Sequence, residues 1–262
     1  MRRVAICAAV FCLALALSGL RIRQATGEIR LSEALQKSAY ARVAKAWSAS
    51  PDQLAAGWGL AHLPLPKLTA PDATKRSATE GLPPRLSVLV LGQRDQPQVA
   101  LITAEVLSIP SRLAKLLKAY GGEILALPTE RIVVIATHTH AGPRPHFGPL
   151  MRSAFGQPEM DEKEIANAVS YAANRARQSY QRVTFGEASS RLSGYVANRS
   201  PGVSSPIDDR LRAVTLNAKG RKLLIWSYAS HPTLVSRKSP TADGDYPARV
   251  ANILEEQAGL NQ

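Results

Sequence analysis

The sequence predicts an α/β fold in which helices flank a mixed β-sheet. Short apolar runs that are rich in β-branched residues recur along the chain, and their length favours strands over helices. Longer stretches with apolar residues at helical spacing alternate with these runs. A strand, a helix and a second strand joined by short links are typical of a βαβ crossover. The sheet should therefore contain a parallel pair beside antiparallel ones.

The chain is long enough for a sizeable core and is strongly basic. Its 262 residues, 45% of them hydrophobic, suit one large domain or two small ones. Lys and Arg number 33 against 20 Asp and Glu, a formal net charge of +13. This excess favours an anionic partner, either nucleic acid or a membrane surface with acidic lipids. The sequence has no Cys/His finger, aromatic RNA-binding signature or long Lys/Arg block, so we expect no nucleic-acid binding.

The N-terminus resembles an export signal. Arg2 and Arg3 precede an apolar run from Val4 to Leu17, and small residues follow it. We predict that residues 1–19 are a signal peptide, with an uncleaved N-terminal anchor as the alternative. The protein is then periplasmic or secreted. Both cysteines lie inside this segment, so the mature chain needs no disulfide.

Residues 20–56 are predicted to form an N-terminal helical segment. Apolar residues recur at four-residue steps between Glu28 and Trp47, and Pro51 closes the pattern. From Gly57 to Pro84 prolines, glycines and small polar residues dominate, which indicates either irregular chain around one short strand or a linker.

The middle of the chain predicts a β-hairpin, a helix and a buried strand. The runs 86–91 and 99–104 flank a turn at 93–97. A helix opens near Pro110, with apolar residues at helical spacing, and Gly121-Gly122 should end it. The run Ile132–Ala136 then reads as a buried strand.

The second half predicts a long helix followed by more strands. Asp161–Arg182 begins with acidic residues and finishes with basic ones, which complements a helix dipole. A strand is expected at 185–192 and a hairpin from strands 212–216 and 222–228. A short helix should follow Tyr246-Pro247 and run to about Gly259.

Three histidines follow the ends of predicted strands. His138 and His140 come directly after Ala136, and strand alternation would put both rings on one face. His231 lies just past the strand at 222–228. Neutral imidazole is the usual nitrogen ligand of zinc, so His138 and His140 are candidate metal ligands. The alternative is a pair of hydrogen-bonded histidines at a strand end.

Four short motifs in order resemble the neutral/alkaline, non-lysosomal ceramidases. They are Thr137-His-Thr-His-Ala-Gly-Pro143, Asn198-Arg199, Ser230-His-Pro-Thr233 and Gly244-Asp-Tyr-Pro247. The resemblance runs from about Gly57 to the C-terminus and implies part of the amino-terminal catalytic domain of that family.

The resemblance implies the chemistry of that family, which cleaves the amide bond of ceramide with one zinc ion. It implies His138 and His231 as zinc ligands and His140 as a catalytic neighbour that orients groups or binds substrate. Arg199 would hold the polar end of the substrate and assist catalysis, beside Asn198, and Asp245 would fix the geometry around the metal. The implied partner is a ceramide-like lipid at a membrane surface. The oligomeric state is not predicted.

The chain also departs from the family. There, the segment matching 243–262 is followed by a further strand with a Gly-Asp-x-Ser-Pro turn, by a glutamate and a tyrosine that complete the zinc shell, and by a C-terminal β-domain. We therefore expect residues 57–262 to be an incomplete ceramidase-like α/β domain. Three interpretations stay open: a fragment of a longer enzyme, a shortened relative that takes ligands from Asp243, Asp245 or a partner chain, or an inactive, lipid-binding remnant.

Overall fold

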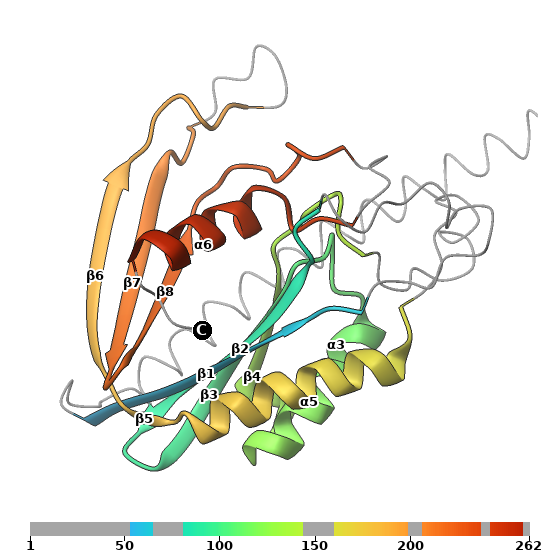
Figure 1. Cartoon of the computed structure of the whole chain (residues 1–262), viewed down its shortest axis with the longest axis vertical. Coiled ribbons are helices and arrows are strands. Elements are labelled where there is room, and N and C mark those ends of the chain that lie inside the picture. The colour runs from blue at the N-terminus through green and yellow to red at the C-terminus, as the bar shows by residue number, and fades with distance from the viewer. Residues whose placement is uncertain (1–52, 65–80, 144–159, 199–205, 237–241, 259–262) are drawn as a thin grey trace, which may run out of the picture. The chain divides into compact units, whose positions relative to one another are not determined.

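The computed structural model of the protein describes residues 53–64, 81–143, 160–198, 206–236 and 242–258 (Figure 1). All of these residues belong to one compact unit, Pro51–Gln262. The predicted signal segment 1–19 and the predicted helix between Glu28 and Trp47 lie outside the described residues. None of the helices in the described ranges has both the length and the apolar run needed to cross a membrane.

The centre of the unit is a five-stranded mixed sheet in the order β4-β3-β2-β1-β5. Its strands are β1 (Leu54–His62), β2 (Arg85–Gln93), β3 (Gln96–Ala104), β4 (Ile132–Ala136) and β5 (Gln181–Arg182). Strands β3 and β4 run parallel, and the other pairs are antiparallel. The helix α3 (Ser111–Leu125) and the short 3₁₀ turn η2 (Thr129–Arg131) link β3 to β4. The predicted mixed sheet and βαβ crossover are confirmed.

Helices cover one face of this sheet. The helix α5 (Glu162–Gln178) and α3 pack on the apolar residues of β2 and β3 that share that face. Because side chains alternate along a strand, every second residue of β2 and β3 points toward the helices and is buried there. The buried cluster includes Val88, Val90 and Ile102 from the sheet and Leu117, Val169 and Ala173 from the helices.

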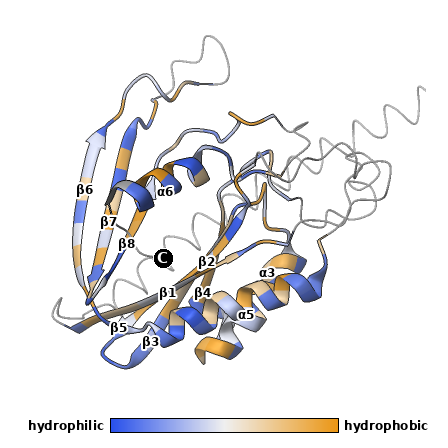
Figure 2. Cartoon of the chain, in the orientation of Figure 1, coloured by the Kyte–Doolittle hydropathy of each residue, from blue (hydrophilic) through white to orange (hydrophobic). Residues whose placement is uncertain are grey.

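A second, antiparallel sheet packs on the opposite face. It contains β6 (Thr184–Arg191), β7 (Arg210–Ala218) and β8 (Arg221–Ser227) in that order. Leu216 of this sheet joins Trp58 and Leu89 of the central sheet in a second buried cluster. Strand β6 is largely exposed and mostly hydrophilic (Figure 2). The last helix is α6 (Asp245–Ala258).

The strand predicted at Ile132–Ala136 is confirmed as β4, but it is buried on one face only. Ile132 is buried under α3, whereas Val133 and Ile135 are 48% and 40% exposed. The second buried cluster draws on β1, β2 and β3 and does not reach β4. One β-branched face of β4 therefore stays uncovered by the described residues.

Several predicted boundaries shift. Strand β1 begins at Leu54, so residues 54–56 join the sheet and not the N-terminal helical segment. Helix α5 ends at Gln178, and the chain then turns into β5. Helix α6 already starts at Asp245, with Pro247 in its first turn. The N–H groups of the first turn have no partner within the helix, so a proline there removes no hydrogen bond.

Gly121 and Gly122 do not end α3, which corrects the prediction. Both are buried inside the helix, and the helix ends at Leu125 with Ala126 in the left-handed conformation. A Cβ at Gly121 would lie 2.9 Å from Ile102 Cδ1, and one at Gly122 would lie 2.7 Å from the Leu127 carbonyl oxygen. The two glycines therefore permit close packing of the helix rather than its termination.

This packing makes Gly122→Ala destabilising. Helix propensity alone would favour alanine by about 1 kcal/mol. Overlap with the Leu127 carbonyl should outweigh that gain and lower the free energy of unfolding by roughly 1–3 kcal/mol. Urea denaturation would measure the change, with Lys115→Ala on the exposed side of α3 as control. A Gly122→Ala variant more stable than the parent chain would contradict this account.

Candidate metal centre

The three predicted histidines come together at the ends of β4 and β8. The centroids of the His138 and His140 rings are 5.3 Å apart, those of His138 and His231 5.0 Å, and those of His140 and His231 4.8 Å. One ring nitrogen from each residue lies within 4.8 Å of the others. His138 and His231 are exposed and His140 is half-buried, so the cluster is open to solvent.

A sharp turn, and not strand alternation, brings His138 and His140 together. After β4, the Thr137 N–H donates to the Ala104 carbonyl (3.1 Å) and the His138 N–H to the Val106 carbonyl (3.0 Å). His138 itself is left-handed, with φ 67°, which is uncommon for a residue other than glycine. The intervening Thr139 is fully buried. The chain therefore leaves the strand pattern at His138, and the two imidazoles converge through this local turn.

The His138 ring is oriented by a backbone acceptor. Its Nδ1 lies 2.6 Å from the Leu107 carbonyl oxygen. A carbonyl oxygen can only accept, so Nδ1 carries the proton and the lone pair is at Nε2. A backbone carbonyl on the non-ligating nitrogen is a common device for fixing the tautomer of a metal-binding histidine.

The His140 and His231 rings face each other directly. Their Nε2 atoms are 2.8 Å apart. If both nitrogens carried lone pairs, they would repel each other at this distance. Either one ring donates an N–H hydrogen bond to the other, or a cation lies between the two. The backbone N–H of His140 also donates to the Pro232 carbonyl (3.4 Å), and this bond joins the two histidine loops.

The segment Asp243–Tyr246 holds the loop that carries His231. The Asp245 carboxylate is fully buried and accepts the N–H groups of Leu234 (3.3 Å) and Val235 (2.9 Å). The Tyr246 hydroxyl donates to the Ser230 carbonyl (2.9 Å). The loop is therefore fixed on both sides of His231. Asp245 has φ 62°, a left-handed conformation that this network stabilises.

The same segment holds the loop that carries His140. The Asp243 N–H donates to the Ala141 carbonyl (3.0 Å), and the Asp243 carbonyl accepts the Thr139 hydroxyl (3.1 Å). The Asp243 carboxylate binds the Arg249 guanidinium at 2.6 and 3.1 Å. Burial would raise the pKa of Asp243, but Arg249 and backbone N–H groups outweigh it and keep this pKa below its ordinary value.

These contacts exclude Asp243 and Asp245 as replacement metal ligands. Both carboxylates point into the protein and are occupied by backbone N–H groups or by Arg249. Among the described residues, the histidine cluster includes no carboxylate. The interpretation in which these aspartates supply missing ligands is therefore wrong.

Glu105, to which the sequence assigned no role, has a buried carboxyl next to the 243–246 segment. Glu105 follows β3, and its Oε2 accepts the Arg85 N–H at 2.9 Å. A Cβ at Gly244 would overlap this carboxylate, so glycine allows the 243–246 segment to approach it. Burial raises the pKa of Glu105 to about 7, although Arg85 opposes the shift. An acidic residue at the end of an apolar strand was the only available signal.

The remaining predicted residues cannot be placed around the cluster. Asn198 is exposed and is the last described residue before 199–205. Arg199 lies outside the described residues, as does His146 in the loop after Pro143.

Comparison with solved structures identifies the fold. The chain superimposes on a ceramidase complexed with C2, with a TM-score of 0.62, 17% identity and 80% of this chain covered. It also superimposes on the neutral ceramidase from Pseudomonas aeruginosa, with a TM-score of 0.62, 16% identity and 78% of this chain covered. The fold is ceramidase-like.

The ceramidase-like fold is established at the level of structure alone. The chain spans 36% of the length of each of these two solved chains. No family model matches the sequence, and no curated protein matches it either.

Asp245→Asn should loosen the His231 loop. The substitution keeps the size of the side chain but turns one acceptor into a donor that faces a backbone N–H. We expect a loss of about 1–3 kcal/mol in the free energy of unfolding and faster amide exchange at Leu234 and Val235. Asp208→Asn is the control, because among the described residues that exposed carboxylate contacts only Arg212 and the nearby Arg210 N–H. Unchanged exchange at both amides would argue against this role.

Glu105 should make stability depend on pH. Its pKa is higher in the folded chain than in the unfolded one, so the folded state binds the proton more tightly. The free energy of unfolding should then fall as pH rises from about 4.5 to about 7, by at most roughly 3 kcal/mol from this group, and level off above. Glu105→Gln should flatten that decline in urea denaturation. An equally steep decline in the variant would assign it to other groups.

Proposed function

We propose that this chain carries the histidine part of a zinc-dependent amidohydrolase site of the ceramidase type. The observation that carries the proposal is the convergence of three histidine ring nitrogens within 4.8 Å on a ceramidase-like fold. The substrate class is ceramide or a related N-acyl lipid, in which an amide bond joins an acyl chain to an amino alcohol.

The donor set fits zinc. Catalytic zinc sites commonly combine three protein ligands with one open position, and imidazole is a preferred ligand. His138 offers Nε2 because Leu107 holds its Nδ1. His231 and His140 direct their Nε2 atoms at each other, so a cation that replaced the shared proton would be bound by both rings. When bound, zinc would supply Lewis-acid chemistry, lowering the pKa of a water molecule and polarising the amide carbonyl.

His140 has two candidate roles. The family resemblance implies a neighbour of the metal that orients groups or binds substrate. The short distance from His231 supports instead a third ligand, because no carboxylate of the described residues joins the cluster. We favour the ligand role in this chain.

Arg199 and Asn198 are proposed to bind the polar part of the substrate. A guanidinium donates hydrogen bonds in a planar fork that suits a carbonyl oxygen on which negative charge develops. Arg199 would supply this donor and assist the reaction, with Asn198 beside it.

An exported protein with a positive surface suits a lipid substrate. We propose that residues 1–19 direct or anchor the chain outside the cytoplasm and that basic residues bring it to an anionic membrane surface. A second function is a lipid-binding remnant without catalysis. The observation that favours it is that no carboxylate of the described residues joins the three histidines.

Metal content and turnover test the proposal together. The purified chain should bind close to one zinc per molecule, and His138→Ala should lose most of it. His62→Ala is the matched control, since that exposed histidine lies on β1 outside the cluster. If His140 is a ligand, His140→Ala should lower zinc affinity by a factor of about ten or more. If it only orients groups, zinc should remain and turnover of a fluorescent ceramide should fall.

The outcomes separate the two functions. Zinc binding with zinc-dependent turnover supports the hydrolase. Lipid binding that is unchanged after zinc removal, with no turnover, supports the remnant. Full zinc content in His138→Ala would overturn the assignment of the site.

A further inference from the structure

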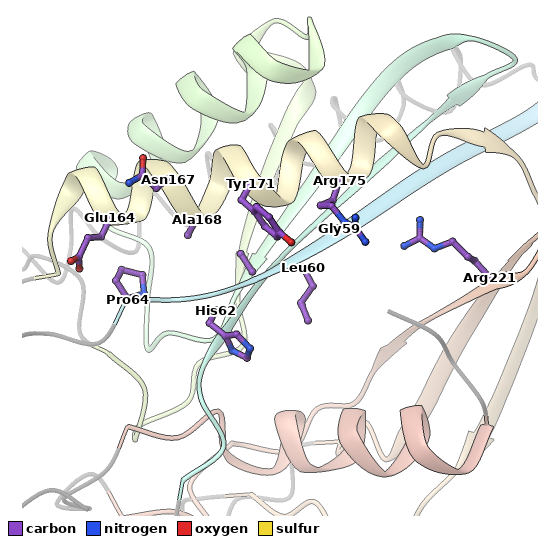
Figure 3. A pocket seen from close by; sticks show the side chains of 11 residues that line it. Gly59, Leu60, His62, Pro64, Glu164, Asn167, Ala168, Tyr171, Arg175 and Arg221 are labelled. Carbon is purple, nitrogen blue, oxygen red and sulfur yellow. The ribbon is translucent and has the colours of Figure 1, made fainter. Parts of the chain in front are cut away.

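A second site lies beside the outer edge of β1 and shares no lining residue with the histidine cluster. It is a pocket of about 830 Å³ bordered by β1 from Gly59 to His62, by one side of α5 and by Arg221 at the start of β8 (Figure 3). None of the three clustered histidines lines it. Its volume falls in the range of small-molecule sites.

The edge of β1 is open along this pocket. Strand β5 pairs only with Ala55 and Ala56. Further along, the N–H of Trp58 donates to the Ser179 hydroxyl (3.0 Å), and the Trp58 carbonyl accepts from Arg221 (3.3 Å). Backbone groups on one edge recur at every second residue, so the N–H and carbonyl of Leu60 also face outward. Among the described residues, no backbone hydrogen bond to Leu60 comes from this side.

Two guanidinium groups converge at the same edge. Arg221 is held against β1 by its bond to Trp58 and lies 4.7 Å from the centroid of the Trp58 ring. The Cβ of Arg175 lies close to Gly59: a Cβ added to Gly59 would be 2.5 Å from it. Figure 3 shows the two guanidinium groups pointing toward one another. Burial, and then the charge of Arg175, lower the pKa of Arg221, as expected for like charges held close together.

No acidic side chain of the described residues neutralises this pair. The salt bridges among the described residues involve neither Arg175 nor Arg221. Glu164 is the only carboxylate in the described lining, and it precedes Arg175 by three turns of α5, about 16 Å along the helix axis. The arginine end of the pocket therefore concentrates positive charge, which an anionic ligand would relieve.

We propose that this pocket binds the phosphate group of a phosphate ester. Two guanidinium forks and the Leu60 N–H supply convergent donors, and arginine forks match phosphate oxygens. Tyr171 points its hydroxyl into the pocket and is 59% exposed, so it adds a polar group and an aromatic face. The ligand is either the headgroup of an anionic phospholipid or a soluble phosphate ester. The site is independent of the proposed zinc chemistry.

The test uses the metal-free full chain and measures binding of inorganic phosphate by calorimetry. Binding of phosphatidylcholine vesicles with and without phosphatidylglycerol is measured by sedimentation. Arg175→Gln should weaken phosphate binding about tenfold, because it removes a charge-assisted hydrogen bond. The double variant Arg175→Gln/Arg221→Gln should weaken it further. The control is Lys115→Gln/Arg131→Gln, which removes the same charge from exposed residues outside the pocket.

Each result has a definite meaning. Phosphate and phosphatidylglycerol binding that both fall in the Arg175 variant, but not in the control, support a lipid headgroup. Loss of phosphate binding with unchanged vesicle binding supports a soluble phosphate ester. Equal losses in the pocket and control variants would overturn the proposal, since only net charge would matter. Replacing Arg221 also removes its contact with Trp58, which can unfold the double variant. The single variant Arg175→Gln keeps that contact, so it tests the proposal by itself.

Discussion

The geometry of the candidate metal centre depends on the hydrogen bonds of one short segment, Asp243–Tyr246. Its backbone binds the loop around His140, and its side chains bind the loop around His231. The segment also begins α6, so a helix N-terminus anchors it. Two loops from different sheets keep their histidines at hydrogen-bond distance because a third element is bonded to both, in addition to the direct bond from the His140 backbone to Pro232. Remote positioning of this kind is typical of metal sites, where partners of the ligands set the orientation of the rings.

The two sheets explain why the histidines meet at all. The parallel pairing of β3 and β4 places the end of β4 beside the end of β3, and backbone hydrogen bonds continue past both strands to His138. The second sheet packs on the opposite face through Leu216 and neighbouring residues, and β8 delivers His231 from that side. The site therefore forms where the end of a parallel crossover meets the end of an antiparallel sheet.

Local patterns in the sequence were sufficient for the elements and for the candidate ligands. Short apolar runs rich in β-branched residues predicted β2, β3 and β4. The position of His138 and His140 after a strand end predicted that these two would meet, and the family resemblance added His231. The mechanism of clustering was not predictable, because the left-handed turn at His138 is imposed by contacts distant in sequence. Thr139, for example, bonds to Asp243, 104 residues away. Gly121 and Gly122 were misread for the same reason, since glycine serves both helix ends and close packing.

The acidic residues near the site are used for structure rather than for chemistry at the surface. Asp243 and Asp245 bind Arg249 and backbone N–H groups, and Glu105 is buried against Arg85. A buried carboxylate is stable only when such donors surround it, so none of the three can turn outward without losing the donors that hold it. The three imidazole rings, in contrast, lie near solvent and carry no negative charge. The described residues therefore offer nitrogen ligands without a compensating negative charge. A cation held there would keep most of its positive charge, which is the condition that the proposed hydrolase chemistry would need.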